Sequence, residues 1–523
     1  MLIFFYVLSI LLMILLPIFL AALLRRRFIT PWFLFCAGIL TFTASQVVHL
    51  PLNAWLADLG LLPQAGRNVN PPLWQYALVA GLTAGICEEL ARTAGYAILK
   101  RYRRFEDGVM MGLGHGGFES MVFGGVMTAA GISSLLSLNG KDLSAMNLSV
   151  EQLNAVQFQI QALLSSPWQA FMPLVERLLA MTAHVIFSLL VLRAFTHRNA
   201  GYVILAIVYH AAVDFGAVYL SQSLKNGNFW LLEGGFALIL LPGIIWLVWL
   251  FSSNKPAQVK HTASLSVEWS VFVIALRKEL LQMWRTKRIL VVAAVFGLFG
   301  MASPVMAYFM PQMFKAIPGA EQFANLFPKP SVVDALTQYT KNITQFGFIL
   351  AIFLGMGAVA GEKERGTASL VLSKPMTRWA FVTSKFTAQV LVYLLGFALA
   401  LLGAYFYIVA LFGPYNFGTL AMVTFLLLAW LLPFVALTLD GSVIGGSTSA
   451  AAGIALLGAV ILLLLANIPQ YGSLFPSGLT AWAGQIGAGT AAVTANGGAL
   501  AASLVLTVVG LITAIAIFEQ QEL

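Results

Sequence analysis

The stretch Ile86-Cys87-Glu88-Glu89-Leu90-Ala91-Arg92 places two carboxylates and a guanidinium inside an apolar run of helix length. Each such group costs about 2.5–3.5 kcal/mol at the centre of a bilayer on insertion scales. In a helix, Glu88, Glu89 and Arg92 share one side because they are spaced i,i+3 and i,i+4. We therefore expect them to face a paired or wet interior, where a functional site is the first interpretation. The alternative is a self-neutralised polar cluster that only holds helices together.

Composition sets the class of protein. Apolar residues make up 60% of the 523-residue chain and charged residues only 9%, whereas soluble domains carry about 25% charged residues. This composition predicts an all-α, polytopic protein of a cell membrane, in a bacterium the inner (plasma) membrane. The net charge of +9 is spread over short loops between apolar runs, so it indicates membrane topology and not a nucleic-acid partner.

Thirteen membrane spans in two bundles follow from a length of about 20 residues per crossing. Seven lie near 2–24, 30–50, 73–98, 108–137, 168–192, 201–221 and 230–252, and six near 289–310, 343–361, 379–412, 418–438, 447–467 and 497–518. The fourth span is long and is expected to bend at its glycines. Basic loops such as Arg25-Arg26-Arg27 alternate with loops poor in Lys and Arg. The positive-inside rule then places the N-terminus outside and the C-terminus in the cytoplasm.

A polar break separates the two bundles. Residues 1–252 are expected to form the first domain, 253–264 a cytoplasmic linker, and 265–523 the second domain. The second domain opens with residues 267–285, which are amphipathic and basic. Such a segment is typical of a helix that lies in the cytoplasmic interface of the lipid bilayer.

Proton-active side chains on four different spans fall at one predicted depth, roughly 12–17 Å below the inner surface at 1.5 Å per residue. They are Glu88, Glu89, His115, His184 and His210. His115 and Glu119 are spaced i,i+4, so they face one direction. The same spacing relates His210 and Asp214. Such a set suits a zinc-like site, or a carboxylate and imidazole pair that activates water.

Other interpretations of these side chains stay open. A histidine inside a membrane can serve only as a hydrogen-bond partner between helices. Two histidines at one depth can also hold a haem axially, and acidic groups in spans can form a pathway for protons or ions.

The first half resembles a known family through the order of its short motifs. They are Glu88-Glu89-x-x-Arg92, His115-Gly116-Gly117-Phe118-Glu119, Glu176-Arg177 with His184, and His210-x-x-x-Asp214. This order resembles the YhfC family of intramembrane metalloproteases, which is similar to the clan of CAAX-processing proteases. The resemblance covers residues 1–252.

The resemblance implies roles for these residues. Glu88 or Glu89 would act as general base on water, Arg92 would orient the acidic pair, and Asp214 would orient His210. The implied catalytic set is Glu88, Glu89, Arg92, His115, Glu119, His210 and Asp214. Three histidines would hold a metal such as zinc, or polarise the scissile carbonyl: His115, His184 and His210. Some branches of the clan place the basic residue one position later, so the resemblance leaves metal binding open, and such folds also serve as non-catalytic binding or immunity proteins.

The second half resembles a different class. Gly361-Glu362-Lys363-Glu364-Arg365-Gly366-Thr367 lies at the predicted cytoplasmic end of a span, after the amphipathic segment. With six spans, residues 265–523 resemble ABC transporter permeases of the type-2 exporter class. In that class the turn and the interface helix are where the ATPase docks, which implies docking by Arg277, Glu279, Glu362, Glu364 and Arg365. No Gly-x-x-x-x-Gly-Lys-Ser/Thr phosphate loop occurs in the sequence. ATP would therefore act through a separate ATPase subunit, and a second permease copy would complete the pathway.

The sequence thus predicts a fusion of an intramembrane peptidase with an exporter permease for a peptide or other hydrophobic cargo. One alternative is a transporter or resistance permease whose first half is a catalytically inactive scaffold. Another is an ion or proton translocator.

Overall fold

The computed structural model describes residues 2–63, 71–139, 150–165, 167–224, 229–254, 265–315, 329–468, 471–492 and 494–522. No strand occurs among these residues and most of them are helical, which confirms the all-α class. Contacts between Cα atoms divide the chain into two units, Met1–Thr128 with Gln157–Lys260, and Ala129–Val156 with His261–Leu523. Most of the predicted linker, residues 255–264, lies outside the described residues.

Twelve helices in the described part of the chain are long and apolar enough to cross a membrane, which confirms the polytopic class. The remaining predicted span is also a helix, α3 (Leu73–Ile98), and its 26 residues suffice to cross a bilayer. Glu88, Glu89 and Arg92 make α3 too polar to be counted among these twelve apolar helices. Its passage through the membrane therefore stays a prediction.

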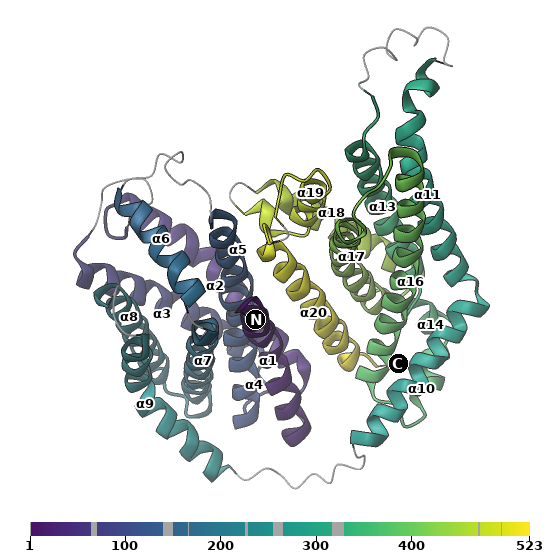
Figure 1. Ribbon diagram of the computed structural model, residues 1–523. Coiled ribbons are helices and arrows are strands. Elements are labelled where there is room, and N and C mark those ends of the chain that lie inside the picture. Colours follow the sequence, from purple (N-terminus) through teal and green to yellow (C-terminus); the bar gives the residue numbers. More distant parts are fainter. Residues whose placement is uncertain are drawn as a thin grey trace. The chain divides into compact units, whose positions relative to one another are not determined.

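The first unit consists mainly of long helices: α1 (Leu2–Phe28), α2 (Trp32–Asp58), α3, α4 (Phe105–Glu119), α7 (Met172–Thr196), α8 (Gly201–Ser223) and α9 (Phe229–Ser253). The shorter α6 (Val150–Ser165) and the 3-10 turn η3 (Pro167–Phe171) precede α7. In Figure 1 these helices are purple to teal; α3 packs against α2 and α8, and α4 packs against α2 and α7. Four helices, α3, α4, α7 and α8, therefore enclose one interior.

The predicted span 108–137 consists of three successive segments, α4, the π-helical η1 (Ser120–Met127) and α5 (Thr128–Leu138). The interruption lies at η1, which contains Gly124 and Gly125. A π-helical stretch adds a residue to the helical turn and is frequent at functional sites. Here it begins directly after Glu119.

Two glycines let the helices of the first unit approach closely. A methyl group at Gly116 of α4 would lie 2.7 Å from Cβ of His184 on α7. One at Gly85 of α3 would lie 2.7 Å from the carbonyl oxygen of Ile207 on α8. Because Cβ atoms do not approach other atoms this closely, the sequence needs glycine at both contacts. Short side chains from different helices can then meet inside the unit.

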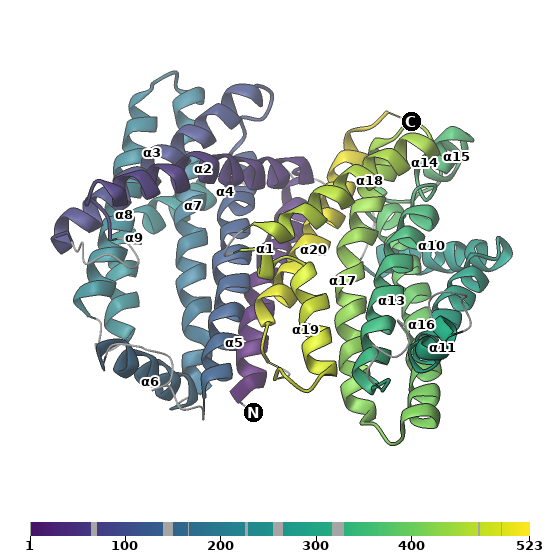
Figure 2. The same ribbon diagram turned by 90° about the horizontal axis from the view of Figure 1, so that it is seen from above.

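The second unit holds α10 (Leu265–Arg285), α11 (Arg288–Lys315), α13 (Val332–Gly355), α14 (Ala360–Glu364), α15 (Thr367–Leu372), α16 (Arg378–Phe412), α17 (Phe417–Ile444), α18 (Thr448–Leu464), α19 (Ser477–Gly487) and α20 (Gly497–Gln520). Figure 2 shows α17 in the middle of this unit, where it packs against α13, α16, α18, α19 and α20. Its Leu427, Leu431 and Phe434 are buried in the apolar core. The helix predicted over 267–285 is present as α10.

The short helix α19 was not predicted. Its 11 residues lie between two predicted spans, and they bury Leu479 and Trp482. Because 11 residues are too few to cross a bilayer, a search for spans misses this helix.

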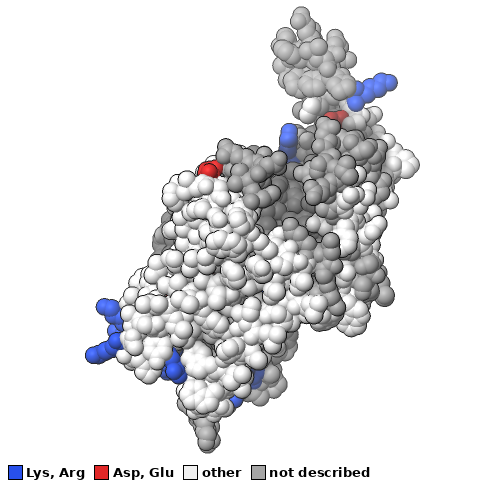
Figure 3. All heavy atoms as spheres, turned by 90° about the vertical axis from the view of Figure 1, so that its left-hand side faces the viewer, with Lys and Arg blue, Asp and Glu red and all other residues white. Residues whose placement is uncertain are grey.

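The outward faces of the helices are apolar. Leu205 and Val208 of α8, and Leu238 and Val248 of α9, are exposed although they are large and hydrophobic. Figure 3 shows that most described Lys and Arg side chains of the visible face gather toward its lower end, beside a broad uncharged belt. A belt of this kind bounded by basic residues is typical of a surface in contact with lipid.

Candidate functional site

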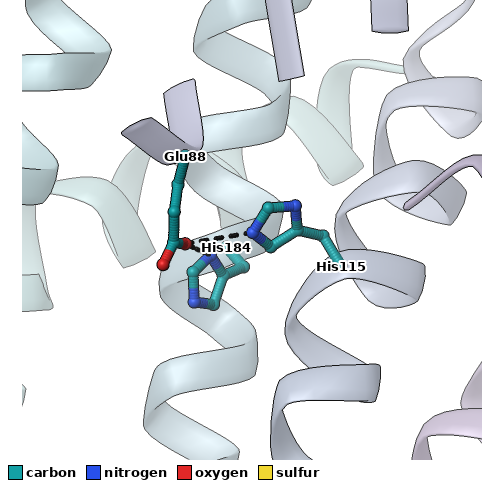
Figure 4. Close-up of side chains that lie close together, drawn as sticks. All are labelled: Glu88, His115 and His184. Atoms are coloured by element: carbon teal, nitrogen blue, oxygen red, sulfur yellow. Dashed lines mark hydrogen bonds and ion pairs between the residues drawn. The ribbon is translucent and has the colours of Figure 1, made fainter. Parts of the chain in front are cut away.

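Four polar side chains from four helices meet inside the first unit: Glu88 of α3, His115 of α4, His184 of α7 and His210 of α8. At most 6% of each residue is exposed. Figure 4 shows Glu88, His115 and His184 pointing toward one another from separate helices. The ring centres of His115 and His184 are 4.9 Å apart, and those of His184 and His210 are 5.4 Å apart. The side chains that the sequence placed at one depth therefore form one cluster.

Glu88 is at the centre of this cluster. Its Oε2 lies 3.0 Å from Nε2 of His115. The same oxygen lies 4.0 Å from Nδ1 of His184 and 4.0 Å from Nε2 of His210. Its other oxygen, Oε1, accepts a hydrogen bond of 3.3 Å from Nε2 of Gln46 on α2. One carboxylate oxygen thus lies within 4.0 Å of all three imidazoles and within hydrogen-bond distance of His115.

Thr41 of α2 contacts the His115 ring on Nδ1, while Nε2 faces Glu88. The Thr41 hydroxyl has one hydrogen, which it donates to the carbonyl oxygen of Gly38 at 2.8 Å. While that hydrogen is on Gly38, the oxygen accepts from Nδ1 of His115, 3.0 Å away; turned to Nδ1, the same hydroxyl donates to the ring. In the first case the Nε2 lone pair of a neutral ring faces Glu88 Oε2, and in the second Nε2 donates its hydrogen to that oxygen. Only the first case places two lone pairs 3.0 Å apart, where a proton or a metal ion has to join them.

His184 is held on both of its nitrogens. Arg92 of α3 donates from Nη2 to Nδ1 of His184 at 3.1 Å, and arginine can only donate. Nε2 therefore carries the hydrogen of the neutral ring and contacts Oε2 of Glu119. Glu119, which was predicted to be catalytic, thus holds the ring of His184 in place.

His210 is held by a different carboxylate. Its Nδ1 lies 2.8 Å from Oε1 of Glu89 and donates to it, because a carboxylate accepts. The Nε2 lone pair is left on the side of Glu88, and Oδ2 of Asp214 lies 3.6 Å from Nε2. His210 is therefore oriented by the hydrogen bond that it donates from Nδ1 to Glu89. Asp214 lies near the other ring nitrogen, Nε2.

Glu89 and Arg92 form a fully buried ion pair, and each residue is 0% exposed. Arg92 donates from Nη1 to Glu89 Oε1, and its other terminal nitrogen reaches His184. Removal of one partner of such a pair leaves an uncompensated charge in the interior. Arg92 therefore ties one member of the acidic pair to the histidine cluster.

The donor atoms of the cluster fit a metal ion of the zinc type. One atom each of Glu88, His115 and His184 lies within 4.8 Å of the other two. The His184 nitrogen toward Glu88 is Nδ1, so an ion bound there would replace the hydrogen bond from Arg92. Imidazole nitrogens with a carboxylate oxygen are the ligands of catalytic zinc, which keeps one position open. Nε2 of His115 faces Glu88 and offers its lone pair to an ion there when Thr41 accepts the ring hydrogen on Nδ1. His210, 4.0 Å from the same oxygen, stays a predicted ligand.

A cavity of 310 Å³ adjoins the cluster, and His184, His210 and Asp214 lie in its wall. Helices α4, α7, α8 and α9 supply its lining. This volume is in the range of small-molecule sites, which begins at about 300 Å³. The imidazoles of His184 and His210 are therefore within reach of a molecule that enters the cavity.

Three further residues belong to the site although they were not among the predicted catalytic or metal-binding residues. Thr41 and Gln46 are polar side chains in an otherwise apolar span, which was the available signal. Arg177, quoted above only as part of the motif Glu176-Arg177, donates to Glu176 at 2.5 Å and to Glu119 at 3.0 Å. Arg177 is thereby connected to the ring of His184 through Glu119.

Two of the predicted ATPase-docking residues, Glu279 and Glu362, are buried in an internal ion network of the second unit. Nζ of the buried Lys385 lies 2.8 Å from Oε1 of each carboxylate. Lys278 donates to the same two oxygens at 2.8 and 2.7 Å. The network joins α10, α14 and α16. The other predicted docking residues are exposed: Arg277, Glu364 and Arg365.

The first unit is a helical membrane bundle with a buried centre of histidines and carboxylates. The second unit is a helical bundle in which an ion network joins α10 to α14 and α16. Together they define a two-part membrane protein. Residues 12–235 match the YhfC intramembrane metalloprotease family, and residues 273–523 match the ABC-2 family of transporter proteins. Both resemblances are therefore confirmed, as is the location in a cell membrane. Residues 12–235 are thus similar to the YhfC family, and residues 273–523 are similar to the ABC-2 permeases.

Two curated relatives come from Bacillus subtilis (strain 168). The uncharacterized transmembrane protein YxlG is 29% identical over 213 residues, which are 40% of this chain and 79% of the relative. The uncharacterized membrane protein YhfC is 26% identical over 237 residues, which are 45% of this chain and 90% of the relative.

Proposed function

We propose that residues 1–252 form an intramembrane peptidase and that residues 265–523 form the membrane subunit of an exporter driven by a separate ATPase, with 253–264 as a linker. One observation carries the first part of this proposal. Glu88 and three imidazoles from separate helices converge beside a cavity of 310 Å³ that can receive a peptide.

Glu88 is suited to take the proton of the attacking water, because its Oε2 is the atom on which the imidazoles converge. The hydroxyl oxygen of that water forms a bond to the carbonyl carbon, and the bond from this carbon to nitrogen breaks. His210 lies in the cavity wall, with Nε2 toward Glu88 and Asp214. It is placed to pass the proton to the leaving nitrogen, while Glu89 and Asp214 stabilise the protonated ring.

In a metal-bound form, a zinc-type ion would be held by Glu88, His115 and His184, and Glu88 would then be a ligand and not the base that takes the proton. When bound, the ion would make a coordinated water more acidic and polarise a peptide carbonyl. The contacts of Thr41 to His115 and of Glu119 to His184 then fix the rings through their outer nitrogens. Elemental analysis of the purified protein distinguishes a zinc enzyme from a metal-free, glutamate-dependent one.

The second part would transport a peptide or another hydrophobic cargo related to the product of the first. Two copies of the permease and an ATPase chain would form the working transporter. We assign the docking of the ATPase to the exposed Arg277, Glu364 and Arg365. Glu279 and Glu362 would act inside the permease, because Lys278 and Lys385 bind them there.

The peptidase proposal is tested in cells that express the full chain. New N-termini among membrane peptides are compared by mass spectrometry for the unaltered protein, Glu88→Gln and His210→Ala. Both variants should abolish the processed peptides and leave co-purification of the ATPase unchanged. Glu106→Gln, at the start of α4 and bound to Arg104 at 3.1 Å, is the control and should process normally. Processing that persists in Glu88→Gln would leave the first half as a non-catalytic scaffold.

A further inference from the structure

Glu233 is a buried carboxylate that the proposed reaction does not use. It lies near the start of α9, is 5% exposed, and lines the cavity beside the histidine cluster. Its Oε2 is buried and has no hydrogen-bond partner among the described residues. A carboxylate in this position is costly unless a cation or a proton compensates it.

The other charged groups of the cavity wall already have partners. Arg177 is the one arginine of the lining, and it binds Glu119 at 3.0 Å and Glu176 at 2.5 Å. Asp214 faces Nε2 of His210 at 3.6 Å. The lining therefore holds four carboxylates against one guanidinium, and Glu233 is the carboxylate that forms no ion pair among the described residues.

The cavity is long enough for a stretch of peptide. Glu176 and His184 both line it and are eight residues apart on α7, which is about 12 Å along a helix. Because Glu176 and Arg177 are the charged neighbours of Glu233, this carboxylate belongs to the end of the cavity away from the cluster. An extended chain covers about 12 Å with three to four residues.

The remaining wall is apolar, with Ala180, Ala183, Val213, Ala217, Leu232 and Phe236 in the lining. A ligand that suits this cavity has an aliphatic part and one cationic end. Lysine and arginine side chains have this composition, because apolar stems carry their charged groups.

Building on the proposed peptidase function, we propose that Glu233 is a specificity residue that binds a cationic group of the substrate. The substrate places a primary ammonium or guanidinium group against Glu233 while its scissile bond lies at the histidine cluster. The cation stands within a few residues of that bond, as the length of the cavity requires.

The test measures the charge preference of the cavity without any substrate. The full chain is purified in an uncharged detergent with the half-buried Cys36 and Cys87 replaced by alanine. Ser221→Cys then supplies one thiol in the cavity wall. Its rates of reaction with 2-aminoethyl methanethiosulfonate, a cation, and 2-sulfonatoethyl methanethiosulfonate, an anion, are compared with Glu233 intact and in Glu233→Gln.

The ratio of cation rate to anion rate should fall about tenfold in Glu233→Gln, since a nearby charge in a poorly screened cavity acts strongly. Glu233→Asp should retain most of the preference because it keeps the charge. A thiol at the exposed end of α9, from Ser252→Cys, should show the same ratio with and without Glu233→Gln. The cation n-butylammonium, and not 1-butanol, should slow labelling of Ser221→Cys only while Glu233 is present.

Equal ratios for the Glu233 protein and Glu233→Gln would overturn the proposal, because a protonated or screened carboxyl attracts no cation. Equal protection by n-butylammonium in both proteins would overturn it as well. Neither readout depends on peptide cleavage. Failure of this proposal is therefore distinguishable from failure of the peptidase proposal, which the Glu88→Gln processing experiment reports.

Discussion

Glu88 Oε2 lies 3.0 Å from Nε2 of His115, and the Thr41 hydroxyl lies 3.0 Å from the other nitrogen of that ring. An imidazole binds a metal through the nitrogen that carries no hydrogen. By accepting the ring hydrogen on Nδ1, the hydroxyl of Thr41 would free the Nε2 lone pair of His115 for a metal. This dependence is open to a direct test.

Thr41→Val should weaken zinc binding by about 10- to 100-fold, because a ligating histidine loses the partner that orients its ring. Competition with a chelator on the purified protein measures the affinity. Thr43→Val is the matched control, since among the described residues the Thr43 hydroxyl bonds only to the carbonyl oxygen of Ile39 in its own helix, at 2.9 Å. Equal affinities of the two variants would show that Thr41 does not fix the tautomer.

Arg92→Met should destabilise the protein by about 3–5 kcal/mol, because Glu89 keeps its charge in the interior without a partner. Unfolding in mixed micelles of increasing SDS content measures the loss. The double variant Glu89→Gln with Arg92→Met should recover part of the stability, since no unpaired charge remains. A double variant that is no more stable than Arg92→Met would refute the charge argument.

Gly116→Ala should cost about 1–3 kcal/mol, as overpacking does, because the new methyl group would meet Cβ of His184 at 2.7 Å. It should also lower peptide processing by displacing that ring. Gly234→Ala on α9 is the control, since no atom of the described residues lies within 4 Å of a methyl group there. If both variants retain full stability and processing, α4 and α7 do not pack as closely as the structure shows.

The sequence is sufficient to predict the helices because the bilayer allows few alternatives. An apolar run of about 20 residues has to satisfy its backbone internally, so it is helical. The same argument predicts the shared depth of His115, His184 and His210, since depth along a helix is counted in residues. It does not predict α19, whose 11 residues are held by the burial of Leu479 and Trp482 against neighbouring helices.

The partners of the site residues depend on how the helices rotate and pack, and the sequence alone does not state this. Thr41 and Gln46 are single polar groups, and only the packing of α2 brings them to His115 and Glu88. Glu362 has the same sequence context as a solvated loop residue. Its burial follows from the position of Lys385 on another helix.

The ion network of the second unit predicts a loss of stability at high pH. Burial by itself lowers the pKa of Lys278, but Glu279 and Glu362 outweigh it and raise that pKa above its ordinary value. Because the folded pKa exceeds the unfolded one, the stabilisation is complete below about pH 10 and is lost as the pH rises through the folded pKa. Melting temperatures at neutral pH and at about pH 11 should therefore differ more for the unaltered protein than for Lys278→Met. An equal difference would exclude Lys278 as the source.

Arg365→Ala should reduce co-purification of the ATPase while leaving the melting temperature of the permease unchanged, because Arg365 is exposed beside the turn at Gly366. Glu362→Gln should act first on the melting temperature of the permease and not on binding of the ATPase. It weakens the bonds of Lys278 and Lys385 inside the protein and therefore lowers the melting temperature. Pull-down of the ATPase and melting in detergent are measured on the same preparations. If Arg365→Ala binds the ATPase normally and Glu362→Gln loses it at an unchanged melting temperature, the partner reaches the buried network and our docking surface is wrong.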